Sequence, residues 1–176
     1  MVLIGGLLYL YNDSKKIGQE IDSYKGVPVY HNGILYTRSY GKNYSIDGYY
    51  YGLKWQCVEY IKRFYYDALS HKMPDVLGNA KDFYDENVSH GQLNKRRNLV
   101  QYKNGENVKP QEDDLIVFTD TMYGHVAIVT KVADDYIEVI QQNVFGKPRA
   151  RYTINCIDGK WYVGEARKPA GWLRKE

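Results

Sequence analysis

The sequence predicts a single α+β domain from its length and two periodic patterns. The chain has 176 residues, the size of one domain. Over residues 57–69 apolar side chains recur at steps of three and four, the spacing of one face of a helix. From residue 113 onward, short apolar runs alternate with turn signals, as in antiparallel strands. Helical pattern first and strands afterwards favour the α+β class.

Residues 1–24 are expected to lie outside this domain, which we place at residues 25–176. Residues 2–11 are apolar, but they are about half of the ~20 residues that a membrane helix needs, and the basic residues and cleavage site of a complete signal peptide are lacking. Three interpretations stay open: an anchor remnant, a buried element of the fold, or a partner-binding segment. An anchor would bring membrane contact and a place in the cell envelope or periplasm; otherwise we expect a cytoplasmic protein. Residues 12–24 are polar and predict a linker or a short surface helix.

The first half of the domain is expected to hold a hairpin and two helices. The turn signal "HNG" separates "VPVY" from "ILYTR", which predicts a hairpin over residues 27–38. The helix at 57–69 follows, and "NAKDFYDEN" predicts a second short helix with Asn79 as its cap. Residues 88–112 are polar and basic and predict loops and turns.

The second half is expected to be sheet. Asp134 and Asp135 form the turn of one antiparallel pair, and "DGK" marks another hairpin. The predicted strands are "DDLIVF" (113–118), "GHVAIVTKV" (124–132), "DDYIEVIQQNV" (134–144), "RARYTINCID" (149–158) and "KWYVGEA" (160–166).

Composition excludes several functional classes. A net charge of +3 is too small for a nucleic-acid binder, so we expect no nucleic-acid partner. The four histidines are scattered and there is no CxxC or HExxH, so we expect no metal site and no cofactor. Cys57 and Cys156 make no disulfide framework, although a bond between them stays open.

Cys57 stands at the predicted first turn of the helix, a position that favours a reactive thiolate. The positive end of a helix dipole and a neighbouring imidazolium lower a thiol pKa, and unpaired first-turn amides can bind an oxyanion. His125, after Gly124 at the start of a strand, is the leading candidate for the base, with Gln141 or Asn143 to orient its ring. The alternative is structural: Cys57 a small buried apolar residue, as Cys156 is expected to be, and His125 a structural histidine.

The motifs "WQCVEY", "DDLIVF", "GHVAIVT" and "QQN", in that order, resemble the CHAP family of cysteine- and histidine-dependent amidohydrolases and peptidases. Within that family, the likeness is greatest to the amidase domain of glutathionylspermidine synthetase/amidase, over about residues 50–172. The resemblance implies a papain-like fold with N-terminal helices packed on an antiparallel sheet. It also implies Cys57 as nucleophile, His125 as general base and Asn143 as the asparagine of the third strand.

The sequence departs from the family at two points. Gln141 stands where the family usually has a carboxylate, and a neutral amide orients an imidazole without stabilising its positive form. Lys62 and Arg63 replace an arginine pair, so the bidentate fork that would bind a substrate carboxylate is lost at the first position.

Three residues near the nucleophile have two interpretations each. Gln56 either donates to the oxyanion or is a surface residue. Trp55 either walls the groove or packs under the helix. Glu59 is expected to support the helix dipole or to pair with Lys62 or Arg63.

These features predict a monomeric cysteine amidase or peptidase that cleaves an amide bond through an acyl-thiol intermediate. Its peptide or amide substrate is expected in peptidoglycan, because the domain stands alone, an anchor is an option and the run "NKRRN" is basic enough for a cell-wall polymer. The alternatives are a glutathionylspermidine-type small-amide amidase and a non-catalytic binding module with the same fold.

Overall fold

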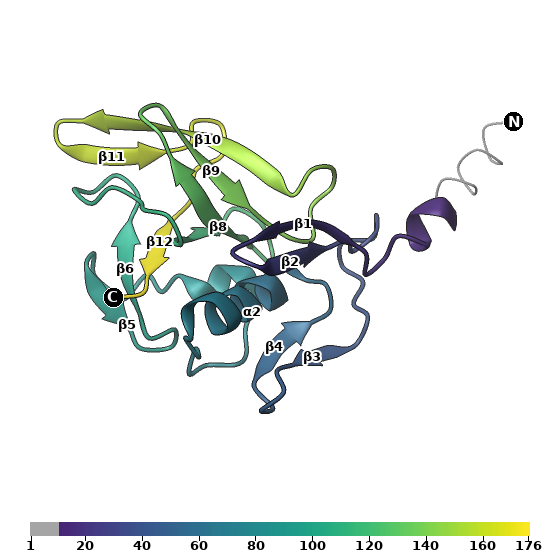
Figure 1. Cartoon of the computed structure of the whole chain (residues 1–176). Coiled ribbons are helices and arrows are strands. Elements are labelled where there is room, and N and C mark those ends of the chain that lie inside the picture. The colour runs from purple at the N-terminus through teal and green to yellow at the C-terminus, as the bar shows by residue number, and fades with distance from the viewer. Residues whose placement is uncertain (1–10) are drawn as a thin grey trace, which may run out of the picture.

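The computed structural model describes residues 11–176 (Figure 1). The apolar stretch at residues 2–10, and with it the choice between anchor, buried element and partner-binding segment, lies outside the described residues. Among the described residues, no helix is long and apolar enough to cross a membrane.

One eight-stranded antiparallel sheet and one main helix form the domain, which confirms the α+β class (Figure 1). The strand order is β11-β10-β9-β8-β7-β12-β6-β5. The five strands expected in the second half are present, namely β7 (Leu115–Phe118), β8 (His125–Val132), β9 (Tyr136–Ile140), β10 (Arg149–Ile157) and β11 (Lys160–Val163).

The helix α2 (Cys57–Leu69) packs its apolar face on the sheet. Tyr60, Ile61 and Phe64 are fully buried and belong to the same core as Val126 and Ile128 of β8. Of the helices expected before the sheet, α2 is the one full α-helix that packs on it. The second predicted helix is present as a short 3₁₀ helix, η1 (Ala80–Phe83), and Asn79 is its cap, as expected. The backbone N–H of Asn79 donates to the Asp82 carboxylate at 2.7 Å.

The first hairpin lies one strand earlier than predicted. β2 (Val27–Tyr30) pairs with β1 (Glu20–Tyr24), which falls in the stretch expected to be a linker or a surface helix, and residues 34–38 form a loop. Lys25 and Gly26 at the turn have φ of 49° and 78°, the pair of positive values that a tight two-residue hairpin requires. A second hairpin joins β3 (Lys42–Tyr44) to β4 (Tyr50–Leu53).

Residues 88–112 also hold strands, contrary to the loops predicted there. β5 (Gln92–Asn94) and β6 (Leu99–Lys103) form one edge of the sheet, and β12 (Gly171–Arg174) from the chain's end lies between β6 and β7. These strands contain polar side chains and therefore lack an apolar pattern in the sequence, but the side chains are buried and hydrogen-bonded. Gln101 Nε2 donates to the carbonyl of Asp85 at 2.8 Å, and Asn94 Nδ2 donates to that of Phe83 at 3.0 Å.

Candidate active site

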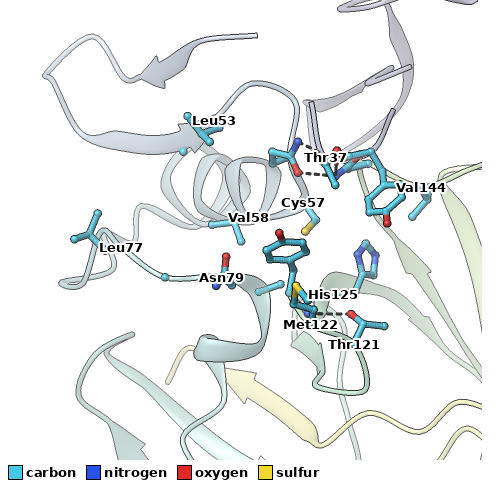
Figure 2. A pocket seen from close by; sticks show the side chains of 18 of the residues that line it. Thr37, Leu53, Cys57, Val58, Leu77, Asn79, Thr121, Met122, His125 and Val144 are labelled. Carbon is cyan, nitrogen blue, oxygen red and sulfur yellow. Dashed lines mark hydrogen bonds between the residues drawn. The ribbon is translucent and has the colours of Figure 1, made fainter. Parts of the chain in front are cut away.

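Cys57 and His125 line the same cavity, which has a volume of 760 Å³ (Figure 2). Cys57 is the first residue of α2 and His125 the first of β8, two elements in direct contact. The two side chains therefore line one cavity because the start of the helix and the start of the strand lie against each other. Cys57 and Cys156 are both free, so no disulfide joins them. Among residues 11–176, no group of three or more His, Cys, Asp or Glu side chains could hold a metal ion.

The environment of Cys57 makes it a neutral thiol at rest. Burial of the sulfur raises its pKa to about 11, although backbone N–H groups of Val126, Val58 and Cys57 itself oppose the rise. The sequence had led us to expect a lowered pKa. The helix start does supply favourable amides, but removal of the thiolate from water outweighs them.

His125 is held by Gln141, at the end of the neighbouring strand. The imidazole Nε2 lies 2.9 Å from the amide Oε1 of Gln141, and both side chains are buried. Because an amide oxygen only accepts, Nε2 carries the proton and Nδ1 is left as the acceptor. Burial lowers the pKa of His125 to about 4, with the bond to Gln141 opposing the shift. His125 is therefore a neutral imidazole whose Nδ1 can accept a proton.

Asn143 contacts the loop next to the nucleophile instead of the imidazole. Its Nδ2 donates to Gln56 Oε1 at 2.6 Å and to the carbonyl of Tyr36 at 2.8 Å. Its Oδ1 accepts from Asn32 Nδ2 at 2.6 Å. Of the two residues considered for the orienting role, Gln141 is the one that lies on the ring of His125.

Gln56 lines the cavity but directs its amide at the same loop. Its Nε2 donates to the carbonyls of Arg38 at 2.7 Å and Tyr36 at 3.1 Å. Both amide hydrogens are therefore in use, and an oxyanion-binding role would require the side chain to release one of these bonds.

Trp55, Lys62 and Arg63 lie outside the cavity lining. Trp55 packs on the ring of Tyr30 with centroids 4.2 Å apart. Lys62 is buried and donates to the carbonyl of Tyr50, and burial lowers its pKa to about 8. Arg63 is buried as well. In this conformation all three serve packing rather than substrate contact.

Glu59 and Gln142 form a buried link that sequence reasoning missed in part. Glu59 pairs with Arg63 at 2.6 Å, one of its two expected partners, and also accepts from Gln142 Nε2 at 2.7 Å. Gln142 Nε2 lies 3.0 Å from the carbonyl of Gln56 as well. The link thus ties the start of α2 to the strand end that carries Gln141. The signal available in the sequence was Gln142 itself, a polar residue that directly continues the apolar strand β9.

Three curated relatives align with parts of this chain. It is 29% identical to "Trypanothione synthetase" of Crithidia fasciculata over 84% of this chain and 24% of that protein. It is 32% identical to "Bifunctional glutathionylspermidine synthetase/amidase" of Escherichia coli over 58% of this chain and 17% of that protein. It is 30% identical to "Glutathionylspermidine synthase" of Crithidia fasciculata over 52% of this chain and 14% of that protein. The chain spans less than a quarter of the length of each.

The family comparison covers the site itself. The CHAP domain model matches residues 48–143, a range that begins before α2 and ends at Asn143. It therefore includes Cys57, His125 and Gln141, and it spans more than half of the chain. The chain belongs to the CHAP domain family, which consists of cysteine-dependent amidohydrolases.

Proposed function

We propose that the chain is a cysteine amidase in which Cys57 is the nucleophile and His125 the general base. The observation that carries the proposal is that the thiol and the imidazole, from α2 and β8, line one cavity with the imidazole fixed by Gln141. Cys57 Sγ attacks the amide carbon while His125 Nδ1 takes the thiol proton. The proton then passes to the departing amine, and water hydrolyses the acyl thioester.

The start of α2 is suited to hold the oxyanion of the tetrahedral intermediate. Gln56, the cap residue, makes no side-chain hydrogen bond to the first turn. First-turn amides have no partner within a helix and point along its axis, where they stabilise negative charge. The same amides surround the sulfur, so the oxyanion would form where donors already stand. The papain-like arrangement implied by the family accounts for this geometry.

For the substrate we propose a small amide of the glutathionylspermidine type instead of a peptidoglycan peptide. The sequence favoured the cell wall, but the curated relatives that align with the chain are named for glutathionylspermidine and trypanothione, and one of them is named an amidase. This chain spans less than a quarter of each of those proteins. We therefore take from the resemblance only the cleavage of an amide bond and the type of substrate.

The experiment compares two substrates and four proteins. Release of amine from glutathionylspermidine and from wall peptides is measured with the parent, Cys57→Ser, His125→Ala and Cys156→Ser. We expect turnover of the small amide by the parent and by Cys156→Ser, and losses of about a hundredfold or more in the other two. Wall-peptide cleavage alone would overturn the substrate class. Equal rates in the parent and Cys57→Ser would contradict Cys57 as the nucleophile, and no turnover of either substrate by the parent would favour a binding module.

A further inference from the structure

Three consecutive residues that follow β9, namely Gln141, Gln142 and Asn143, contact three different parts of the site. Gln141 lies on the imidazole of His125, and Asn143 donates to the side chain of Gln56. Gln142, between them, is 1% exposed and contacts the main chain of Gln56. The proposed reaction uses His125 and Gln141, and it gives no role to Gln142.

The side-chain amide of Gln142 joins β2, α2 and the residue before Cys57. Its Oε1 accepts from the backbone N–H of Tyr30 at 2.8 Å. Its Nε2 donates to the carbonyl of Gln56 at 3.0 Å and to Glu59 Oε2 at 2.7 Å. Both amide hydrogens and the amide oxygen are therefore in use, which fixes the orientation of this buried side chain.

The carbonyl of Gln56 belongs to the same peptide group as the N–H of Cys57. Within the helix, that carbonyl accepts from the N–H of Tyr60 at 3.3 Å, which is a long bond. Gln56 itself is extended, with φ of −78° and ψ of 159°, so its peptide group stands at the junction between loop and helix. The shorter contact, from Gln142, therefore fixes the tilt of this peptide group.

The tilt of the peptide group decides where the N–H of Cys57 points. A trans peptide group is planar, and its C=O and N–H point in opposite directions. Because the carbonyl of Gln56 points at buried Gln142, the N–H of Cys57 points away from it. The N–H groups of Cys57 and Val58 lie near the sulfur, where they oppose the rise in the thiol pKa. Cys57 lines the cavity, so its N–H stands beside the carbon that the thiol attacks (Figure 2).

We infer that Gln142 is a positioning residue that directs the N–H of Cys57 at the oxyanion of the tetrahedral intermediate. This inference rests on the proposed function, in which Cys57 attacks an amide carbon. Without the amide of Gln142, the peptide group keeps the long bond from Tyr60 and can turn, so its N–H leaves the oxyanion. Removal of one oxyanion donor lowers kcat by about 10²–10³, and we expect a misdirected donor to cost about tenfold or more.

Two electrophiles separate this role from the reactivity of the thiol itself. N-Acetylglycinal is the aldehyde of the glycyl unit that joins glutathione to spermidine. When the Cys57 thiol adds to it, a C–S bond forms and the thiol proton moves to the carbonyl oxygen, which then lies where the oxyanion would. With iodoacetamide, Sγ displaces iodide from a saturated carbon, the thiol proton goes to solvent, and no oxyanion forms. Mass spectrometry at pH 8 gives the alkylation rate of Cys57 and the aldehyde concentration that halves it.

A second buried glutamine provides a matched control. Gln142→Met keeps the length of the side chain without its hydrogen bonds, and Gln101→Met does the same on β6. Gln101 is equally buried, accepts from the N–H of Asp85, donates to the carbonyl of Asp85 and lies outside the cavity lining. The two variants therefore lose similar bonds, but only Gln142→Met loses a bond to the peptide group of Cys57.

The two variants should differ in every reaction that forms an oxyanion. Gln142→Met should raise the protecting aldehyde concentration about tenfold or more, and should lower kcat on glutathionylspermidine by a similar factor with KM nearly unchanged. Gln101→Met should keep the parent values. The rates of alkylation by iodoacetamide should be nearly equal in the parent and both variants, because that reaction forms no oxyanion.

A measurement on the parent keeps the inference testable if Gln142→Met does not fold. Because the chain has two cysteines, labelling with ¹⁵N-cysteine gives two amide signals, one from Cys57 and one from Cys156. In the aldehyde adduct the amide proton of Cys57 should move downfield, since it gains a hydrogen bond to the adduct oxygen. The signal of exposed Cys156 should stay in place.

An unmoved Cys57 amide in the presence of the aldehyde would overturn the inference. Equal losses of aldehyde affinity in Gln142→Met and Gln101→Met would do the same. Failure of the proposed function gives a different result, namely aldehyde binding that depends on Gln142 together with no amide hydrolysis by the parent. Hydrolysis by the parent, with kcat and aldehyde affinity retained in Gln142→Met, would leave the function standing and remove the role of Gln142.

Discussion

His125 Nε2 and Gln141 Oε1 lie 2.9 Å apart in a buried contact, with an amide where a carboxylate would form an ion pair. A neutral partner fixes the ring without favouring its protonated form. The pKa of His125 is lowered to about 4 and that of Cys57 raised to about 11, both by burial. At neutral pH the resting pair is consequently a thiol beside a neutral imidazole, and the proton moves only as the thiol attacks.

Gln141→Glu should convert this pair toward a thiolate and an imidazolium. A carboxylate at hydrogen-bonding distance raises the pKa of His125 by about 1 to 3, which favours transfer of the thiol proton. Alkylation of Cys57 by iodoacetamide at pH 7 should become faster, while the NMR titration of His125 moves upward. Gln141→Leu, which cannot accept from Nε2, should instead lower kcat about tenfold or more. Equal alkylation rates in all three proteins would contradict the orienting role of Gln141.

The buried neutral histidine makes stability depend on pH. The folded pKa of about 4 lies below the ordinary value of about 6.5, so the unfolded chain binds a proton that the folded chain does not between these values. The contribution is fully present above pH 6.5 and is lost as pH falls toward 4, by about 3 kcal/mol at most. Urea denaturation of the parent and of His125→Gln at pH 7 and pH 4 measures it. Parallel losses in both proteins would show that another group is responsible.

Gly124 sets the approach to His125 and tolerates no side chain. Its φ is +70°, and a Cβ there would lie 2.5 Å from the backbone N of Lys81 and 2.6 Å from the carbonyl O of Phe118. Gly124→Ala should therefore displace the loop that leads into His125, lowering both Tm and kcat. Gly159→Ala is the matched control, because its φ is +75° with nothing within 4 Å. It should cost only the backbone strain, about 1–2 kcal/mol, and leave kcat unchanged. Similar kcat values in the two variants would be the contrary result.

Glu59 is expected to be the most costly carboxylate to remove near the site. It is fully buried and accepts from Arg63 Nε, Asn43 Nδ2 and Gln142 Nε2 at 2.6, 2.8 and 2.7 Å. Glu59→Ala leaves the buried guanidinium without its ion-pair partner and should lower the free energy of unfolding by about 3–5 kcal/mol. Glu106→Gln, which breaks a 3.7 Å pair with Lys160 at the surface, should cost less than about 1 kcal/mol. Comparable losses in the two variants, measured by urea denaturation, would refute the role of Glu59.

The sequence allowed prediction of the elements whose apolar periodicity is unbroken. The 57–69 helix and the strands β7 to β11 are of this kind, and the motifs around Cys57 and His125 lie on them, whereas β12 was not predicted. Strands β5 and β6 were missed because Gln101 and Asn94 are buried through hydrogen bonds that composition does not reveal. The first hairpin was misplaced because "NG" is a stronger local turn signal than "KG", and only long-range pairing decides between them.

Within the site, the sequence could name the groups but not their partners. Gln141 and Asn143 are two positions apart on one segment, yet one contacts His125 and the other Gln56. The positive φ of Asn143, 61°, turns the chain between them, and periodicity gives no sign of it. The pKa of Cys57 was expected to fall, but burial raises it. Burial of the sulfur depends on how the helix and the sheet pack, which the local sequence does not reveal.

The most direct test of Cys57 as nucleophile is the mass of the protein during turnover. Parent protein is mixed with glutathionylspermidine, quenched within milliseconds to seconds, and digested for peptide mass spectrometry. We predict a glutathionyl group, joined as a thioester, on the peptide that contains Cys57, retained in Cys156→Ser and absent in Cys57→Ser. Product formation with no acyl group on Cys57, or an acyl group on Cys156 alone, would contradict a thioester intermediate at this site.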